Sequence, residues 1–224
     1  TDIDSRYRQA IASYQRSLLH RNSLLKDGAG KRHFMEQLNS IDAVLIKEGA
    51  FIMNLRARMV EKVDELGRSI HRHLSSEGER FSAQYRPDIP CDPSEKESIV
   101  RAFVQAMSDN LEKDIAYKST GRGPHRDDME LQLKGLPLRL FGSQGQQRTA
   151  VLTLKLVEAN LKKQESDRKP VLLMDDILSE LDPERQEYMA KITDDLQMLV
   201  TGTENPWSET MVTQWRLHDG ALCR

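Results

Sequence analysis

One long apolar stripe limits what this chain can fold into more than any other feature. Apolar side chains recur at spacings of three and four from Phe34 to Leu74, and only Glu48 interrupts them. The period is about 3.5 residues, which is typical of helices that pack side by side. A helix of roughly 45 residues would extend about 65 Å. Because such a helix cannot be folded into a compact core, the stripe predicts a coiled-coil-like helical arm.

A shorter helical pattern precedes the long one and supplies its partner. Apolar residues recur at helical spacing from Ile3 to Leu18, and the pattern stops near Lys26, before Gly28 and Gly30. Two helices joined by a short turn are expected to form an antiparallel hairpin. We therefore expect residues 1–80 to form the arm.

Between the arm and the rest of the chain the helical pattern is broken. Tyr85 to Pro93 contains three prolines, which disfavour helix at and before their positions. One amphipathic helix is then expected from about Ser94 to Ala116. Residues 81–118 are thus interpreted as a connector and an amphipathic helix that belong to the arm domain.

From residue 119 onward the pattern changes to short strands and helices, and the fold class follows from it. Residues 129–140 alternate apolar with polar side chains on either side of a turn over Gly135–Pro137, which predicts a hairpin. The further expectations are a helix over 146–163, a strand over 171–174 that is buried on both faces, a helix over 183–192, a strand over 196–201 and a closing hairpin through Asp219–Gly220. Alternating strands and helices predict an α/β fold with a parallel sheet, so residues 119–224 are expected to form a partial nucleotide-binding head.

Composition excludes several classes of protein. Charged residues make up 30% and aromatic residues 5%, with 33 basic and 35 acidic side chains, which fits a soluble, helix-rich protein. Two cysteines without zinc-ligand spacing favour a reducing, intracellular compartment. No apolar run approaches the roughly twenty residues that a bilayer span needs. The first residue is Thr1 rather than Met, which suggests a fragment.

Two carboxylates close the expected strand over 171–174. Asp175 and Asp176 follow four aliphatic residues, and open α/β sheets bind ligands at the carboxyl ends of their strands. Mg²⁺ prefers hard oxygen ligands, so one such acid could hold the metal with phosphate oxygens. The second acid could orient an attacking water. The alternative is a solvated strand end followed by a turn.

A polar, glycine-containing loop lies directly before the expected helix over 146–163. It offers the Ser143 hydroxyl, the bare backbone of Gly145 and the free N–H groups of a helix start, which together suit a phosphate. The alternative is an ordinary helix cap, in which the same residues serve the turn.

Taken together, the two stretches resemble the ABC-type ATPases in order and spacing. Residues 143–146 resemble the signature loop, Ser-Gly-Gly-Gln, and residues 179–182 resemble the D-loop, Ser-Ala-Leu-Asp. Gln144 replaces a glycine and Asp176 replaces the usual Glu, and RecF shows both departures within this superfamily. Thr120–Asp128 and the pattern over Tyr7–Lys26 also look like RecF, so the resemblance extends over the whole chain.

The resemblance implies roles for individual residues. Asp175 would coordinate Mg²⁺ and Asp176 would handle the attacking water of ATP hydrolysis. Thr201 and Thr203 stand where many relatives carry a switch histidine, and could hydrogen-bond instead or simply end a strand. In the signature set Ser143, Gln144, Gly145 and Gln146, it is Ser143 and Gly145 that would reach the γ-phosphate of ATP held by a second protomer, with Gln146 and Arg148 in support. The D-loop residues Ser179 and Asp182 would lie at that dimer interface.

No phosphate-binding loop of the form GxxxxGK[ST] occurs in the sequence. Gly28–Lys31 is the nearest similar stretch, but Arg32 stands where Ser or Thr is needed and the stretch joins two expected helices. We interpret it as a helix connection. The intact protein is expected to be a weak, DNA-dependent ATPase, whereas this chain alone is expected not to hydrolyse ATP.

The first forty residues carry seven basic and four acidic side chains, a balance that suits contact with DNA phosphates. The candidate cations are Arg6, Arg8, Arg16, Arg21, Lys26, Lys31 and Arg32. Such binding would be salt-sensitive and independent of base sequence, on duplex DNA or a single-strand/duplex junction. The alternative is a solvated helical face.

Other charged groups are given structural interpretations, with one alternative. His71 and His73 lie two residues apart on a helix and are expected at the surface. For the loop that contains His125, the interpretations are an ordering ion pair of Arg126 with Asp127 or Asp128 and a catalytic role.

By resemblance, the parent protein is an ATP-dependent dimer that acts in recombinational gap repair and replication restart in the bacterial cytoplasm. It would help to load recombinase, with RecR and RecO as partners and no membrane attachment. The alternatives are a structural ATPase of the SMC type, whose coiled coil would be far longer, and a non-enzymatic helical interaction module.

Overall fold

The computed structural model describes residues 2–28, 30, 32–75, 78–165, 170–178, 181–192, 196–203, 205, 207, 213–218 and 220–223. The chain divides into two compact units. The first comprises Thr1–Arg68 and Arg80–Gln147, and the second Ser69–Glu79 and Arg148–Arg224. These ranges differ from the arm, connector and head expected from the sequence, and that functional division stays a prediction. The expected α/β fold class is confirmed by helices combined with a parallel strand pair.

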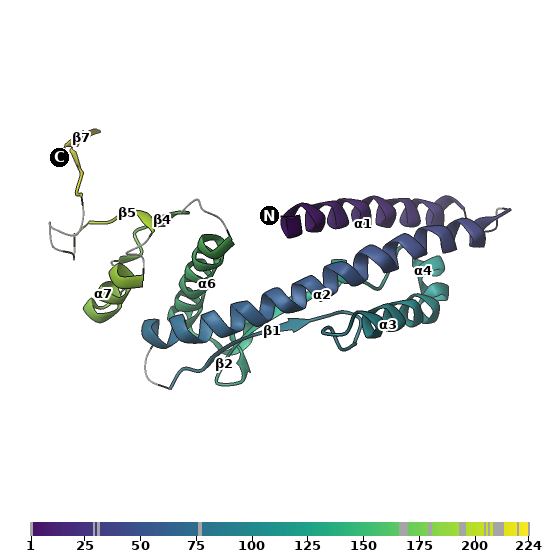
Figure 1. Cartoon of the computed structure of the whole chain (residues 1–224), viewed down its shortest axis with the longest axis horizontal. Coiled ribbons are helices and arrows are strands. Elements are labelled where there is room, and N and C mark those ends of the chain that lie inside the picture. The colour runs from purple at the N-terminus through teal and green to yellow at the C-terminus, as the bar shows by residue number, and fades with distance from the viewer. Residues whose placement is uncertain are drawn as a thin grey trace. The chain divides into compact units, whose positions relative to one another are not determined.

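Two long helices form the body of the first unit (Figure 1). α1 spans Asp2–Asp27 and α2 spans Phe34–Leu74, as the periodicity predicted. With 41 residues, α2 extends about 60 Å. The helices are antiparallel, because Arg6 near the start of α1 pairs with Glu48 (2.7 Å) while Arg21 near its end pairs with Asp42 (2.6 Å). The first of these pairs explains why an acid interrupts the apolar stripe.

The core of this unit lies between α1, α2 and α3, the last spanning Lys96–Asp109. Phe103 of α3 is fully buried against α2 at Gly49. A Cβ atom at Gly49 would lie 2.3 Å from the Phe103 ring, and one at Gly67 would lie 2.5 Å from the Phe81 ring. Glycine weakens a helix interior, so both positions give up helix propensity to let an aromatic ring approach the helix backbone.

A strand that the sequence analysis did not predict follows the long helix. β1, Phe81–Arg86, pairs antiparallel with β2, Asp128–Leu133, over all six residues. Phe81, Ala83 and Tyr85 alternate with polar residues, and this period of two was the available signal. The prolines counted as helix breakers come after the strand and end it.

The predicted hairpin over 129–140 exists, but its turn lies one residue earlier than expected, and its second strand was predicted in the wrong place. Lys134 and Gly135 both have positive φ, 52° and 79°, as a tight hairpin turn requires. The returning strand β3 is only Leu136–Pro137, and residues Leu138–Phe141 form the short helix α5.

The helix expected over 94–116 is two helices, because the chain breaks at Asn110. α3 ends at Asp109 and α4 spans Leu111–Tyr117. The Asn110 side-chain amide donates to the Asp114 carboxylate at 2.5 Å, so this residue is held by side-chain bonding that competes with a continuous helix.

The second unit contains the parallel strands. Its elements are most of α6 (Gln144–Glu165), β4 (Val171–Asp175), α7 (Pro183–Ile192), β5 (Gln197–Thr201), β6 (Arg216–His218) and β7 (Ala221–Cys223). β4 and β5 are parallel, and β6 pairs antiparallel with β7 around Gly220. The helices, the two strands and the closing hairpin were predicted, while Asp219 lies outside the described residues.

Two expectations for this unit were wrong. Leu172 and Met174 are buried, but Val171 and Leu173 are 50% and 73% exposed, so β4 is covered on one face rather than on both. His71, expected at the surface, is fully buried and hydrogen-bonded to the Thr153 hydroxyl at 2.9 Å. Within the described part of the chain, no helix is both long and apolar enough to cross a bilayer.

Candidate functional site

The acids predicted to carry chemistry lie where parallel strands end. Asp175 is the last residue of β4, and the register of the sheet sets it directly opposite Thr201, the last residue of β5. The Thr201 hydroxyl donates a hydrogen bond to Asp175 Oδ1. Both residues are exposed to solvent. The pair therefore stands at the carboxyl edge of the sheet, the usual ligand-binding edge of an open α/β fold.

Asp176 begins the turn that leaves this edge. Its φ of 51° lies in the left-handed region, which is uncommon for a residue other than glycine. The Asp176 N–H donates to the Thr201 carbonyl oxygen at 3.1 Å and to the Thr201 hydroxyl oxygen at 3.2 Å. The turn thus leaves the Asp176 side chain exposed beside Asp175.

The strand end offers the kind of ligands that Mg²⁺ prefers, but few of them. The Asp175 carboxylate and the Thr201 hydroxyl are hard oxygen donors. Among the described residues there is no group of three or more His, Cys, Asp or Glu side chains that could hold a metal. Mg²⁺ commonly binds through one or two carboxylates together with waters and substrate phosphates. The residues present therefore fit a cation that arrives with a nucleotide.

The predicted signature loop forms the start of α6. The Ser143 hydroxyl oxygen accepts the Gln146 N–H at 3.2 Å, and the Ser143 N–H donates to Gln146 Oε1 at 2.9 Å. This reciprocal pair is a capping box, so the helix-cap alternative is realised at these two residues. Ser143, Gln144 and Gly145 are exposed, and a Cβ at Gly145 would meet nothing within 4 Å. Capping and anion binding use the same helix end, and this end remains open to solvent.

The remaining nucleotide-site candidates are only partly described. Asp182 caps α7, because its Oδ1 accepts the Arg185 N–H at 3.0 Å. Thr203 is exposed beyond the end of β5. Ser179 and Glu180 lie outside the described residues, as does Lys31 of the DNA-contact set.

Two of the expected DNA-contacting arginines are engaged within the protein. Arg21 is fully buried and bonds to Asp42 at 2.6 Å, Asp114 at 2.5 Å and the Thr120 hydroxyl at 2.9 Å. Its assignment to DNA contact was wrong, because a guanidinium with no exposed surface cannot reach a phosphate. Arg6 is half-buried, with its charge directed at Glu48.

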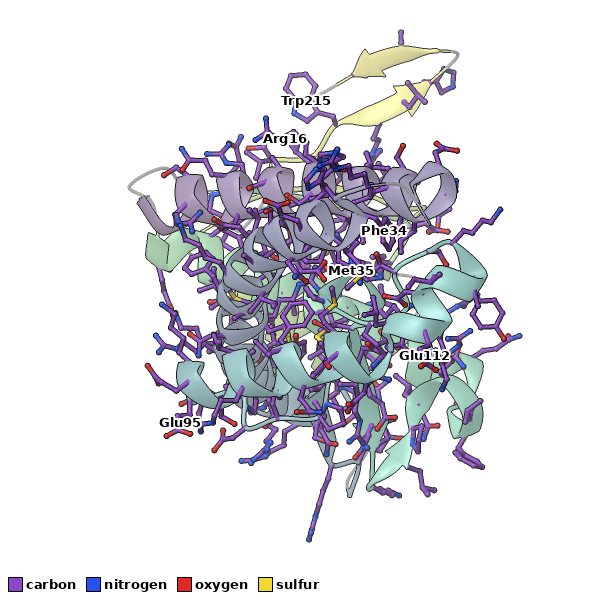
Figure 2. All side chains as sticks on the ribbon, turned by 90° about the vertical axis from the view of Figure 1, so that its right-hand side faces the viewer. Arg16, Phe34, Met35, Glu95, Glu112 and Trp215 are labelled. Atoms are coloured by element: carbon purple, nitrogen blue, oxygen red, sulfur yellow. The ribbon has the colours of Figure 1, made fainter. Side chains whose placement is uncertain are left out.

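The exposed candidates lie along one helix and the turn that follows it. Arg8, Arg16 and Lys26 are exposed on α1, and Arg32 is exposed just before α2. Figure 2 shows Arg16 projecting outward from α1.

The loop over Thr120–Asp128 contains a polar network that sequence reasoning missed. Asp127 accepts hydrogen bonds from the Tyr85 hydroxyl, from Arg56 (3.4 Å) and from the Asp88 N–H (2.9 Å). The expected pairing of Asp127 with Arg126 was wrong, because Arg56 of α2 takes that place. Burial and the bond to Asp127 raise the pKa of Tyr85 far above its usual range. These partners are far apart in the sequence, so no local pattern could have identified them.

The short helix Pro124–Arg126 presents a histidine to the first helix. The Tyr14 hydroxyl and His125 Nδ1 are hydrogen-bonded at 2.8 Å. Burial lowers the pKa of His125, which favours the neutral ring. This pair joins the loop to α1, and like the Asp127 network it serves the fold.

Comparison with known proteins shows what this chain is similar to. No family model matches the chain. The chain is 38% identical over 205 residues to the DNA replication and repair protein RecF of Lachnospira eligens, which covers 91% of this chain and 54% of that protein. It is 35% identical over 195 residues to RecF of Acetivibrio thermocellus, covering 87% of this chain and 53% of the relative.

Solved structures agree with the sequence matches. The recombination mediator protein RecF–ATP of the RecFOR pathway superposes with a TM-score of 0.82 at 29% identity, covering 99% of this chain and 59% of that one. RecF–ATPrS gives a TM-score of 0.80 at 30% identity, with 98% and 59% covered. The chain thus spans about half the length of the curated relatives it matches. Over that length, this chain is similar to RecF proteins of DNA replication and repair in both sequence and structure.

Proposed function

We propose that this chain supplies the signature loop, the magnesium-binding strand end and the D-loop of an ATP-dependent, DNA-binding dimer that acts in recombinational gap repair and replication restart. The observation that carries the proposal is the strand end, where Asp175 and Asp176 are both exposed at the carboxyl edge of parallel strands and Thr201 holds the Asp175 carboxylate. Its cellular role would be to help load recombinase, with RecR and RecO as partners; the similar solved structure is a recombination mediator protein of the RecFOR pathway.

The chemistry proposed at this edge is phosphoryl transfer to water. Asp175 would hold Mg²⁺, which neutralises charge on the phosphate oxygens when bound. Asp176 would orient the attacking water and accept its proton, as a carboxylate within reach of the nucleophile can do.

The start of α6 is proposed to act on a nucleotide bound to a second copy of the protein. Its exposed Ser143 and Gly145 present a hydroxyl and backbone N–H groups, at the end of a helix that carries partial positive charge. Because this chain contains no GxxxxGK[ST] loop, we expect it to release no phosphate from ATP by itself.

The proposal is tested by replacing Ser143 in a chain of full RecF length that contains this sequence. A Ser143→Arg variant places a long cation at the helix start and should abolish ATP-dependent dimerisation, measured by light scattering coupled to size exclusion. Ser108→Arg, an exposed serine of α3, is the matched control and should dimerise normally. Dimerisation of Ser143→Arg at wild-type ATP concentrations would refute the role of the signature loop and favour a non-enzymatic module.

DNA contact is proposed for the exposed face of α1. From Ser5 to Lys26 the sequence contains no Asp or Glu. With Arg21 buried and Arg6 paired to Glu48, the exposed cations of this stretch are Arg8, Arg16 and Lys26. A stretch of helix without carboxylates and with spaced, exposed cations suits the phosphates of duplex DNA and reads no base sequence.

Salt dependence tests this face. Each phosphate contact contributes roughly 0.9 to the slope of log K against log salt concentration. Arg16→Glu combined with Lys26→Glu should therefore lower the slope by about 2, measured by fluorescence anisotropy on duplexes of two unrelated sequences. The control Lys113→Glu, on the exposed side of α4, should leave the slope unchanged. An unaltered slope in the double variant would show that Arg16 and Lys26 do not contact DNA phosphates.

A further inference from the structure

Thr201 contacts both acids of the strand end. Its hydroxyl donates to Asp175 Oδ1, and the same hydroxyl oxygen accepts the Asp176 N–H at 3.2 Å. The Thr201 carbonyl oxygen accepts that N–H as well, at 3.1 Å. One residue of β5 therefore fixes a carboxylate oxygen of Asp175 and the backbone turn at Asp176.

The Thr201 hydroxyl acts both as a donor and as an acceptor, and this restricts which side chains could replace threonine. A hydroxyl can donate one hydrogen bond and accept others, so serine keeps both contacts and valine, with the same shape, loses both. The contact depends on the parallel register, in which Asp175 faces Thr201. Asp175 is exposed, and without a donor its carboxylate would be free to rotate in solvent.

We propose that Thr201 is a positioning residue that orients Asp175 toward the Mg²⁺ of bound ATP, rather than a group that touches the γ-phosphate. This inference rests on the proposed function of the strand end. With Oδ1 held by the Thr201 hydroxyl, the carboxylate has a fixed orientation, and its remaining lone pairs are available to a cation. Mg²⁺ demands near-ideal octahedral geometry, so the orientation of a single carboxylate affects its binding directly.

The expected effect appears in the contribution of the metal to nucleotide binding. Loss of a hydrogen-bonding partner of a metal ligand commonly lowers metal affinity by about 10–100-fold. In a chain of full RecF length that contains this sequence, the dissociation constant of fluorescent ATP is measured in Mg²⁺ and in EDTA. Thr201→Val should shrink the gain in affinity from Mg²⁺ by about tenfold or more, while affinity in EDTA stays within about twofold. Thr201→Ser should retain the wild-type gain.

The outcomes separate this inference from the function on which it rests. A wild-type protein that binds ATP no better in Mg²⁺ than in EDTA would refute the proposed function. If the wild type shows the gain and Thr201→Val keeps it, only the Thr201 assignment fails. If Thr201→Val weakens ATP binding equally in Mg²⁺ and in EDTA, Thr201 contacts the γ-phosphate directly, and its assignment as a positioning residue is also overturned. Thermal melting of each variant checks that the strand pair is intact, and Thr201→Ser provides the test should the valine variant unfold.

Discussion

Carboxylates are used in opposite ways in the two units of the molecule. In the first unit, Asp114 is buried and bonded to a buried arginine, and Asp127 is held by a tyrosine, an arginine and a backbone N–H. In the second unit, Asp175 and Asp176 are exposed at a strand end, where Thr201 bonds to the Asp175 carboxylate and to the Asp176 backbone N–H. Acids that hold the fold are thus surrounded by protein donors, whereas acids proposed to serve a ligand keep oxygens open to solvent.

The difference teaches that burial, rather than residue type, separates structural from functional charge in this chain. A buried ion is costly unless it is paired and hydrogen-bonded, so the Arg21 cluster can persist only when complete. An exposed carboxylate carries no such cost. Removing a charge should therefore damage stability in the first unit and function in the second.

The largest effect on stability is expected from Arg21→Ala. It leaves Asp114 buried without its cation and removes the partner of Asp42. Breaking a buried pair by removing one partner typically costs about 3–5 kcal/mol. The loss should appear in the free energy of unfolding, measured by urea titration followed by circular dichroism.

The control for this change is Arg16→Ala, on the exposed side of the same helix (Figure 2). A surface substitution should stay within about 0.5 kcal/mol of the wild type. Equal effects of the two alanine substitutions would contradict the structural role assigned to Arg21 and reopen it as a surface contact.

Asp176→Asn should give the opposite result, a loss of turnover without a loss of stability. General-base catalysis commonly contributes about 10²–10⁴-fold, so ATP hydrolysis by a full-length RecF-type chain should fall by at least about 100-fold. Because the Asp176 side chain is exposed, the unfolding free energy of the variant should stay within about 0.5 kcal/mol of the wild-type value. Normal turnover in Asp176→Asn would remove this residue from the proposed reaction.

The parts of the fold that the sequence could predict are those that local signals determine. α1 and α2 were predicted with nearly correct ends, because helical periodicity and glycine punctuation are local signals. β1 and the break at Asn110 were not, because their causes are a distant strand and a side-chain bond to Asp114. Local patterns identify elements, while pairing depends on residues far along the chain.

The candidate site likewise contains residues that local patterns identify and a contact that they do not. Asp175 and Asp176 could be found from the aliphatic strand that precedes them, and Ser143 from its place before a helix. The contact of Thr201 with Asp175 follows from the register of two strands, which the sequence does not specify. Arg21 was misassigned for a related reason, since charge is visible in a sequence and burial within a largely polar helix is not.

A smaller effect, in the first unit, is expected from Gly49→Ala. Alanine favours a helix interior over glycine by about 1 kcal/mol, so the sequence alone predicts stabilisation. The structure predicts the reverse, because the added Cβ would lie 2.3 Å from the buried Phe103 ring. Overpacking of this kind typically costs about 1–3 kcal/mol.

Gly145→Ala makes the matched control, since a Cβ there meets nothing within 4 Å. In the first turn of α6 it should leave the fold as stable as the wild type or slightly more so, although it lies in the proposed signature loop. Thermal melting of both variants measures the contrast. Stabilisation by Gly49→Ala would show that Phe103 can move away at little cost.

The smallest effect is expected from His71. Among the described residues of the second unit, it is the one fully buried side chain that can carry a charge. Burial lowers its pKa, against an opposing contribution from Glu79. In the unfolded chain His71 is therefore protonated near pH 6.5, whereas in the folded protein it is protonated only at lower pH. Stability from the neutral ring is complete above that pH, and it should be lost as pH falls from the unfolded pKa toward the folded one.

The unfolding free energy at pH 7.5 and pH 5.5 tests this expectation by comparing the wild type with His71→Gln, which retains an amide that can bond to Thr153 but cannot titrate. Because other groups titrate equally in both proteins, the difference between their pH dependences isolates His71. The variant should lose less stability on acidification. Identical losses would mean that the buried ring is protonated as readily as in the unfolded chain, and that burial in this unit does not govern charge as it does around Arg21.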